Sequence, residues 1–205
     1  MVQVGIIGSG RIARVHILGM LSGVPNVSIR RIASPHLSEE TAAWARAQGI
    51  PQADRDVKGL LSDPTLTAVF VLSSTDTHAP LAIEAMERGK HVFLEKPIDL
   101  DIARARSVVD AAHRTGMKLQ VGFNKRFDHK FLAVKRAVTS GQVGEVQLVK
   151  VTGRDAERPP MDFIAGSGGM LCDMAIHDFD MACFLADSEA VEVFTYGACL
   201  VPPRA

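Results

Sequence analysis

An apolar stretch near the end of the chain carries three ionisable residues at helical spacing: Asp173, His177 and Asp180. At about 100° per residue, a helix would bring them within roughly 60° of one another on one face. Burying such groups is costly unless they are paired or put to use. An imidazole one turn from a carboxylate is the arrangement that orients a general base and stabilises its protonated form. The alternative is a buried His–Asp pair that only satisfies itself.

A lysine held by a proline is the second candidate for chemistry. Lys96 lies between Glu95 and Pro97, directly after a predicted strand, His91–Leu94. Because proline disfavours the α region for the residue before it, the lysine is held extended or, less often, before a cis bond. From a strand's carboxyl end, its ammonium can hydrogen-bond a substrate hydroxyl or bias a nearby histidine. The alternative is a surface lysine in a turn.

The start of the chain predicts a dinucleotide site. A β-branched run, Val2–Ile7, leads into Gly8-Ser9-Gly10-Arg11-Ile12-Ala13 and then into a helical pattern to about Leu21. In such a G-x-G-x-x-A pattern the first glycine permits a tight turn, the second lets backbone approach a pyrophosphate, and the small alanine lets helix pack on strand. The helix N-terminus adds free N–H groups and a positive dipole end. Together these elements predict NAD or NADP binding.

The end of the second predicted strand bears on the choice of cofactor. Val27–Ala33 is followed by Ser34, where an NAD-binding domain usually places an acid that holds the ribose 2′-hydroxyl. Arg30 and Arg31 lie upstream and His36 lies downstream. A hydroxyl and a histidine without a carboxylate would tolerate a 2′-phosphate, so the sequence leans towards NADP or dual use. The alternative is that Ser34 merely caps the next predicted helix.

A polar loop follows the apolar strand Thr67–Leu72. It should line the cofactor crevice, because ligands of open α/β sheets lie outside the carboxyl ends of the strands. Within it, His78 either touches the nicotinamide side or is a helix N-terminal residue without a ligand. The predicted cofactor-binding residues are Gly8, Gly10, Arg11, Ile12, Ala13, Ser34, Ser73, Thr75, His78, Glu95 and Lys96.

Strands and helices alternate up to about residue 122, which predicts a doubly wound parallel sheet of the α/β class over residues 1–122. From Gly144 polar and apolar residues mix, which marks a second domain over residues 123–205. The further predicted helices are Glu39–Gln48, Asp56–Leu61, Ala79–Arg88, Asp101–Thr115 and Phe123–Ser140. The further predicted strands are Lys118–Gly122, Gly144–Asp155 and Val191–Leu200.

Composition excludes several classes of function. The chain of 205 residues is 47% hydrophobic and has zero formal net charge. Its net charge therefore gives no overall electrostatic attraction to nucleic acid or to an anionic membrane. No apolar run approaches the roughly 18 to 20 residues that span a bilayer. Three cysteines, Cys172, Cys183 and Cys199, include no C-x-x-C and predict neither a disulfide framework nor a metal site. We expect a cytoplasmic protein with free thiols.

Four motifs in order carry a family resemblance: the G-x-G-x-x-A turn, Glu95-Lys96-Pro97, Gly122-Phe123-Asn124-Lys125-Arg126-Phe127-Asp128, and Asp173-x-x-x-His177-Asp178-x-Asp180. Together they resemble the glucose–fructose oxidoreductase/inositol dehydrogenase (Gfo/Idh/MocA) family, and within it the bacterial inositol 2-dehydrogenases. The similarity covers essentially the whole chain. It implies a Rossmann domain followed by an α+β domain with a large, mostly antiparallel sheet.

The resemblance also implies roles. It implies oxidation of a secondary alcohol on a polyol or sugar, with hydride passing to C4 of NAD or NADP. Lys96, Asp173 and His177 match the family's catalytic residues: His177 would take the hydroxyl proton, Asp173 would orient it, and Lys96 would hold the reacting oxygen and tune the pKa. The residues that match substrate-facing positions, besides these three, are Arg126, Asp155 and Asp180. For Arg126 the alternative is a structural pair with Asp128.

Two departures from the family pattern matter. Ser34 stands in place of the acid of an NAD-preferring member, and the chain ends at Ala205 although family members run well past 300 residues. We therefore expect a C-terminally truncated chain whose second sheet is incomplete, and a homo-oligomer when full length. The leading hypothesis is an inositol 2-dehydrogenase acting on myo-inositol. The alternatives are a non-catalytic dinucleotide-binding or regulatory protein, and a dehydrogenase for another inositol isomer or an aldose.

Overall fold

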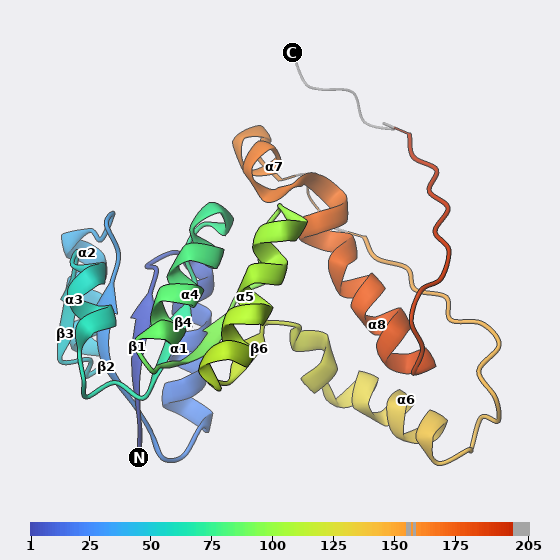
Figure 1. Ribbon diagram of the computed structural model, residues 1–205, viewed down its shortest axis with the longest axis horizontal. Helices are drawn as coiled ribbons and strands as arrows, with labels where there is room; N and C mark the ends of the chain where they lie inside the picture. The colour runs from blue at the N-terminus through green and yellow to red at the C-terminus, as the bar shows by residue number, and fades with distance from the viewer. Residues whose placement is uncertain (155–156, 158, 199–205) are drawn as a thin grey trace.

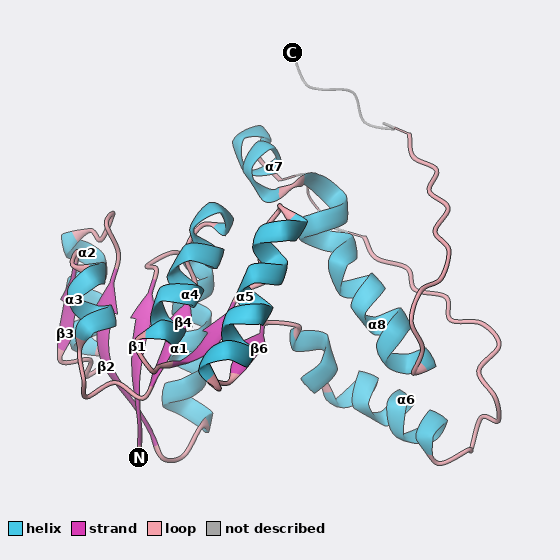
Figure 2. Ribbon diagram, viewed as in Figure 1, coloured by secondary structure: helices cyan, strands magenta, loops and turns pink. Residues whose placement is uncertain are grey.

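The computed structural model describes residues 1–154, 157 and 159–198. Its centre is a six-stranded sheet in which every pair of neighbours is parallel, in the order β3-β2-β1-β4-β5-β6 (Figures 1 and 2). This confirms the predicted doubly wound sheet, whose strand order reverses between β1 and β4. The strands are β1 (Val2–Ile7), β2 (Val27–Ala33), β3 (Gln52–Asp54), β4 (Ala68–Val71), β5 (His91–Leu94) and β6 (Leu119–Val121).

Helices cover both faces of this sheet, which is why its strands are nearly continuous apolar runs. Residues of α1 and α2 pack with β1 and β2 in one hydrophobic cluster, and residues of α3, α4 and α5 pack with β4 and β5 in a second. The helices that form these two layers are α1 (Arg11–Gly23), α2 (Glu39–Ala47), α3 (Val57–Ser62), α4 (His78–Glu87) and α5 (Ile102–Thr115). Crossovers through these helices bring the carboxyl ends of all six strands to one edge.

In the described part of the second half, all regular secondary structure is helical. α6 lies along α8, away from the sheet (Figure 1). The elements are the short 3₁₀ helix η2 (Asn124–Phe127), α6 (His129–Thr139), α7 (Met161–Ser167), the π-helical turn η3 (Leu171–Ala175) and α8 (Ile176–Ala186). No helix within the described part of the chain has both the length and the apolar character needed to cross a membrane.

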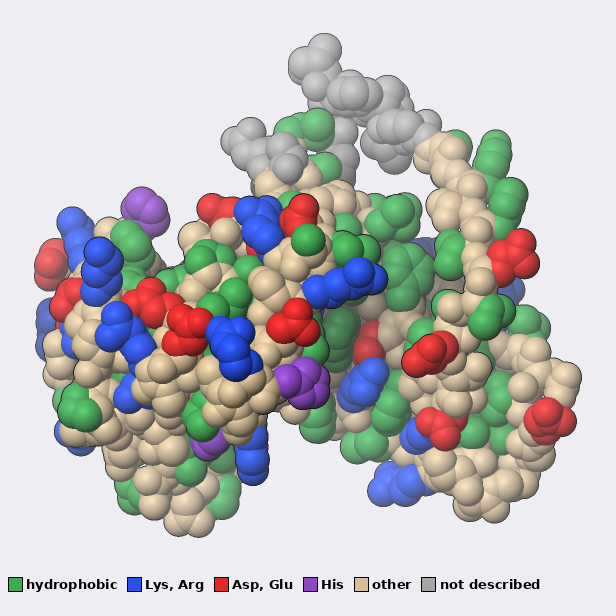
Figure 3. Space-filling model, viewed as in Figure 1, with side chains coloured by type: hydrophobic (Ala, Val, Ile, Leu, Met, Phe, Trp, Pro, Cys, Tyr) green, Lys and Arg blue, Asp and Glu red, His purple; other side chains and the backbone are tan. Residues whose placement is uncertain are grey.

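Two predicted strands are wrong over their described residues. Residues 144–154 and 189–198 contain no regular secondary structure, and no second sheet exists in the described part of the chain. The β-branched and aromatic residues that suggested a strand at 191–196 are instead exposed (Figure 3). A strand needs a neighbour to pair its backbone N–H and C=O groups, and propensity alone does not supply one. No described strand lies beside either segment.

Capping explains where two helices begin. Thr41 N–H donates to the Ser38 side chain at 3.1 Å, so Ser38 and not Ser34 caps α2, and the alternative role of Ser34 is wrong. The predicted helix from Phe123 begins instead as η2. Asp128 then caps α6 by accepting from the N–H of Lys130 at 2.8 Å.

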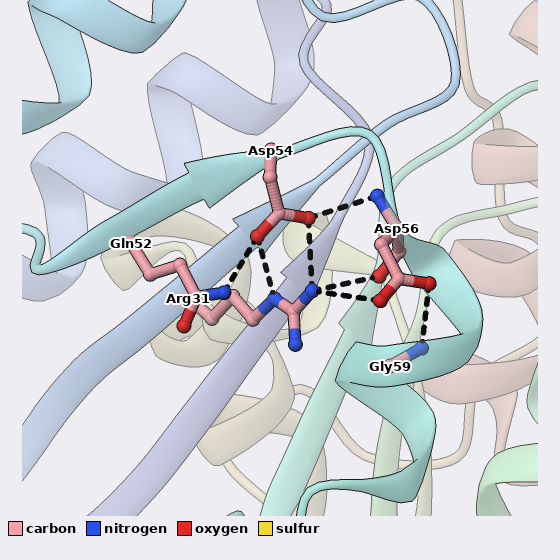
Figure 4. Close-up of polar contacts among 5 residues, drawn as sticks. All are labelled: Arg31, Gln52, Asp54, Asp56 and Gly59. Atoms are coloured by element: carbon pink, nitrogen blue, oxygen red, sulfur yellow. Dashed lines mark hydrogen bonds and ion pairs between the residues drawn. The ribbon is translucent and has the colours of Figure 1, made fainter.

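A buried arginine fixes the edge of the sheet that includes the short strand β3 (Figure 4). Arg31 of β2 donates from Nε and Nη2 to the two carboxylate oxygens of Asp54, both at 2.9 Å, and reaches the Asp56 carboxylate at 3.3 Å. Asp56 in turn caps α3 by accepting from Gly59 N–H at 2.8 Å. Burial acts to raise the pKa of Asp54, but its hydrogen bonds from Arg31 and the Asp56 N–H outweigh burial and lower it. The carboxylates of this edge are thus engaged within the protein.

We expect Arg31→Gln to lower the free energy of unfolding by about 2–4 kcal/mol, because it leaves the partly buried carboxylate of Asp54 without its cation. Arg88→Gln is the matched control, since Arg88 pairs with Glu84 on an exposed helix face, and it should change stability by less than about 0.5 kcal/mol. Urea denaturation of both variants makes the comparison. Equal effects would contradict the anchoring role of Arg31.

Candidate functional site

The turn between β1 and α1 is shaped for the close approach of an anion. Gly8 has φ +118°, and a Cβ there would collide with the carbonyl of Leu72 on the neighbouring strand end. Gly10 is the N-cap of α1 and has no side chain to occupy the first N–H groups, while a Cβ at Gly10 would meet nothing within 4 Å. Ala13 is fully buried under the turn and Arg11 is exposed beside it. An open helix N-terminus of this kind fits a pyrophosphate.

The loop after β4 lies beside this turn, because β1 and β4 are paired. His78 is 2% exposed, and its two ring nitrogens contact the carbonyl oxygens of Pro97 at 2.8 Å and Ser73 at 3.1 Å. The imidazole therefore joins the β4 loop to the β5 loop from inside the protein. This geometry favours the interpretation of His78 as a residue without a ligand. Ser73 and Thr75 remain partly exposed in the loop.

Glu95 joins three elements at the end of β5. Its carboxylate contacts His16 Nε2 of α1 at 2.7 Å and accepts from the backbone N–H of Lys96 at 3.0 Å, and Gly122 leaves room for it after β6. Burial acts to raise the pKa of Glu95, but the His16 and Lys96 hydrogen bonds prevail and lower it. Glu95 thus fixes the backbone from which the Lys96 side chain projects.

Lys96 meets Asp173 although 77 positions separate them. Lys96 Nζ donates to the Asp173 carboxylate and to the Asp173 carbonyl, each at 2.8 Å. The peptide bond between Lys96 and Pro97 is cis. Both side chains are mostly buried, with exposed fractions of 17% and 27%. The structure therefore brings two of the three predicted catalytic residues into contact.

His177 is half-buried in the first turn of α8, and its Nδ1 is buried without a hydrogen-bond partner among the described residues. The predicted pairing of Asp173 with His177 is therefore not formed, because the acid is engaged by Lys96. Asp173 lies in the π-helical turn η3, and its carboxylate is directed to Lys96 and not to the imidazole. Burial, followed by the charges of Lys96 and Lys125, lowers the pKa of His177.

Two more ion pairs join η2 to α8. Arg126 binds Asp180 through two of its nitrogens, at 2.6–3.0 Å, and Lys125 Nζ lies 2.6 Å from Asp178. Hydrogen bonding to Asp180 raises the pKa of Arg126. The structural partner of Arg126 is thus Asp180, and the predicted alternative, a pair with Asp128, is wrong because Asp128 caps α6.

The remaining predicted positions divide as follows. Asp155 lies outside the described residues. Ser34 is buried, and its backbone N–H donates to the backbone carbonyl of Asp54 at 3.1 Å. Lys125 and Asp178 were not predicted; the matching of two adjacent cations with two closely spaced acids was the sequence signal that could have indicated them. No three His, Cys, Asp or Glu side chains of the described chain gather as metal ligands would.

Known proteins resemble the chain over its whole length. A family model described as "Oxidoreductase family, NAD-binding Rossmann fold" (GFO_IDH_MocA) matches residues 2–123, and a GFO/IDH/MocA C-terminal domain model matches residues 131–205. Inositol 2-dehydrogenase of Rhizobium meliloti is 40% identical over 98% of this chain and 59% of its own length. Myo-inositol 2-dehydrogenase of Thermotoga maritima is 38% identical over 97% of this chain and 59% of its own.

A crystal structure of a myo-inositol dehydrogenase from Corynebacterium glutamicum superimposes with a TM-score of 0.83 at 34% identity, covering 90% of this chain and 55% of that one. The chain thus spans little more than half the length of the relatives that it matches.

Two glycine variants distinguish the effect of this turn on stability from its effect on NAD binding. We expect Gly8→Ala to lower the free energy of unfolding by about 3 kcal/mol or more, because φ is positive and Leu72 blocks the Cβ. Gly10→Ala should cost less than about 1 kcal/mol, yet weaken NAD binding at least about tenfold, because its methyl group intrudes where the phosphates would lie. Chemical denaturation and calorimetric NAD titration measure the two effects. Undiminished NAD affinity in Gly10→Ala would contradict a site at this turn.

Proposed function

We propose that this chain, which belongs to the Gfo/Idh/MocA family of NAD-binding oxidoreductases, oxidises a secondary alcohol of a cyclic polyol, with the conversion of myo-inositol to 2-keto-inositol as the first candidate reaction. The observation that carries the proposal is the contact of Lys96 with Asp173, with His177 close enough to Lys96 for that charge to lower its pKa. Lys96 follows the carboxyl end of β5 and the glycine turn follows that of β1, at the same edge of the parallel sheet, which supports a common site.

The side chains can divide the work as follows. His177 is the proton acceptor, because its lowered pKa keeps the imidazole neutral near pH 7 and leaves a lone pair free. Lys96 holds the alcohol oxygen, and Asp173 fixes the direction of the ammonium. The cofactor, when bound at the Gly8–Gly10 turn, supplies the carbon that accepts the hydride.

The substrate class rests on the relatives, two of which are named inositol 2-dehydrogenases at 38–40% identity. Another inositol isomer or an aldose remains the alternative substrate. The family models at residues 2–123 and 131–205 support our division of the chain into a dinucleotide-binding domain, 1–122, and a substrate domain, 123–205. We further propose a cytoplasmic location and a homo-oligomeric assembly.

Turnover is the direct test. Purified protein with NAD or NADP and a panel of inositols and aldoses should form reduced nicotinamide, read by its absorbance. His177→Ala should lower kcat by about 10²–10⁴, because the proton acceptor is gone. His129→Ala, at an exposed histidine of α6, is the matched control and should keep full activity. NAD binding without turnover on any substrate would instead support the non-catalytic alternative.

Cofactor choice gives a second test. Ser34 follows β2 where an acid would select NAD, and the neighbouring Asp54 and Asp56 are engaged by Arg31. We therefore expect the dissociation constants of NAD and NADP to differ by less than about tenfold, or 1.4 kcal/mol. Calorimetric titration with each dinucleotide measures this ratio. A hundredfold preference for NAD would show that another group rejects the 2′-phosphate.

A further inference from the structure

Lys125 and Asp178 form an ion pair beside the candidate base that neither the motif spacing nor the family match assigns. Lys125 belongs to η2, which follows β6, and Asp178 follows His177 directly in the first turn of α8. Their charged atoms lie 2.6 Å apart, and the side chains are 32% and 18% exposed. A partly buried pair of this kind is screened less by water than a surface pair.

The irregular segment 144–154 also packs against the acid of this ion pair. Gly153, in the irregular stretch 144–154, lies so close that a Cβ there would be 2.8 Å from the Asp178 carboxylate. No side chain fits at position 153 unless the carboxylate moves. Asp178 is thus confined from three directions: by its own helix, by Lys125 and by the Gly153 backbone.

His177 has no hydrogen bond that could set its ring position, since its buried Nδ1 is without a partner among the described residues. One aromatic neighbour, Phe123, lies edge-on at a centroid distance of 6.3 Å. The ring therefore depends on its backbone and on the surrounding charges for its placement and its protonation. The charged groups that act on it are Lys96 and Glu95 from the end of β5, Lys125 from η2, and Asp178 from α8.

We propose that Lys125 and Asp178 are positioning residues for His177: their ion pair holds the first turn of α8 against η2 and sets the balance of charge at the imidazole. The consequence for turnover rests on the proposed function, but the effect on His177 does not.

The two members of the pair act on His177 with opposite signs. Lys125 disfavours a second positive charge nearby, and Asp178 favours one. Burial and the charges of Lys96 and Lys125 together lower the pKa of His177 against the smaller, opposing effects of Glu95 and Asp178. Removing the charge of Lys125 should therefore raise the pKa of His177, and removing the charge of Asp178 should lower it.

The test is an NMR titration of the 205-residue chain without substrate or cofactor. The Cε1–H signal of His177 is identified among the seven histidines by its loss in His177→Gln. We expect the midpoint to rise in Lys125→Gln, to fall in Asp178→Asn, and to lie between these two in the double variant. Lys125→Arg, which keeps the cation, should restore the midpoint of the unaltered protein.

A matched control removes a different lysine beside α8. Lys135 contacts Asp187 just beyond the other end of α8 at 3.5 Å, and Lys135→Gln should leave the His177 midpoint unchanged. A merely structural role predicts another pattern, because loosening exposes the ring and moves every variant upward, towards the ordinary value of about 6.5. A rise in both single variants, or shifts no larger than in Lys135→Gln, would overturn the proposal.

If Asp178→Asn does not fold, the Lys125 variants still test the proposal: no rise in Lys125→Gln, or a rise that Lys125→Arg does not reverse, would overturn it. Absence of turnover would overturn the proposed function and leave this result standing. Conversely, an active enzyme with unshifted midpoints would overturn the present inference alone.

Discussion

The ion pair between Lys96 and Asp173 is the contact on which the rest of the site depends. It joins the carboxyl end of β5 to η3, and so places α8 and His177 at the edge of the sheet where the glycine turn opens. A mostly buried pair gains little net stability, because desolvation offsets the attraction, but removing one partner leaves a costly uncompensated charge. The two charges therefore act chiefly as a constraint on geometry, because they are paired only while η3 lies against the carboxyl end of β5.

Much of the first half could be predicted from sequence because its signals are local. β1, β2 and β5 have the bounds that their apolar runs predict, since each is buried on both faces. β3 was missed: its three residues, Gln52–Asp54, include two polar ones, and only pairing with β2 and the bonds from Arg31 make them a strand. The strands expected over 144–155 and 191–200 failed for the opposite reason, because their β-propensity is real but no described neighbour pairs with them.

The candidate site, too, has features that neighbouring residues determine and features that only tertiary contacts determine. The turn at Gly8 and the position of Lys96 after β5 follow from a few adjacent residues, so sequence predicts them. The relation of Asp173 to His177 does not, because the acid is engaged by Lys96, a cation 77 positions away in the sequence. The partner of Arg126 lies 54 positions away, and a choice between that acid and a nearby one is a tertiary outcome that no spacing rule settles.

Charge pairing also explains why we assign the role of proton acceptor to a histidine in a candidate site so rich in carboxylates. Asp173, Asp178 and Asp180 each face a cation, at 2.8, 2.6 and 2.6 Å, and their lone pairs are directed into those bonds. A base must have a lone pair that is free when the substrate arrives. His177, which directly precedes Asp178, has a lowered pKa, and its Nδ1 makes no hydrogen bond in the described structure. The three acids are engaged in ion pairs between elements, and the imidazole is therefore the group to which we assign the proton transfer.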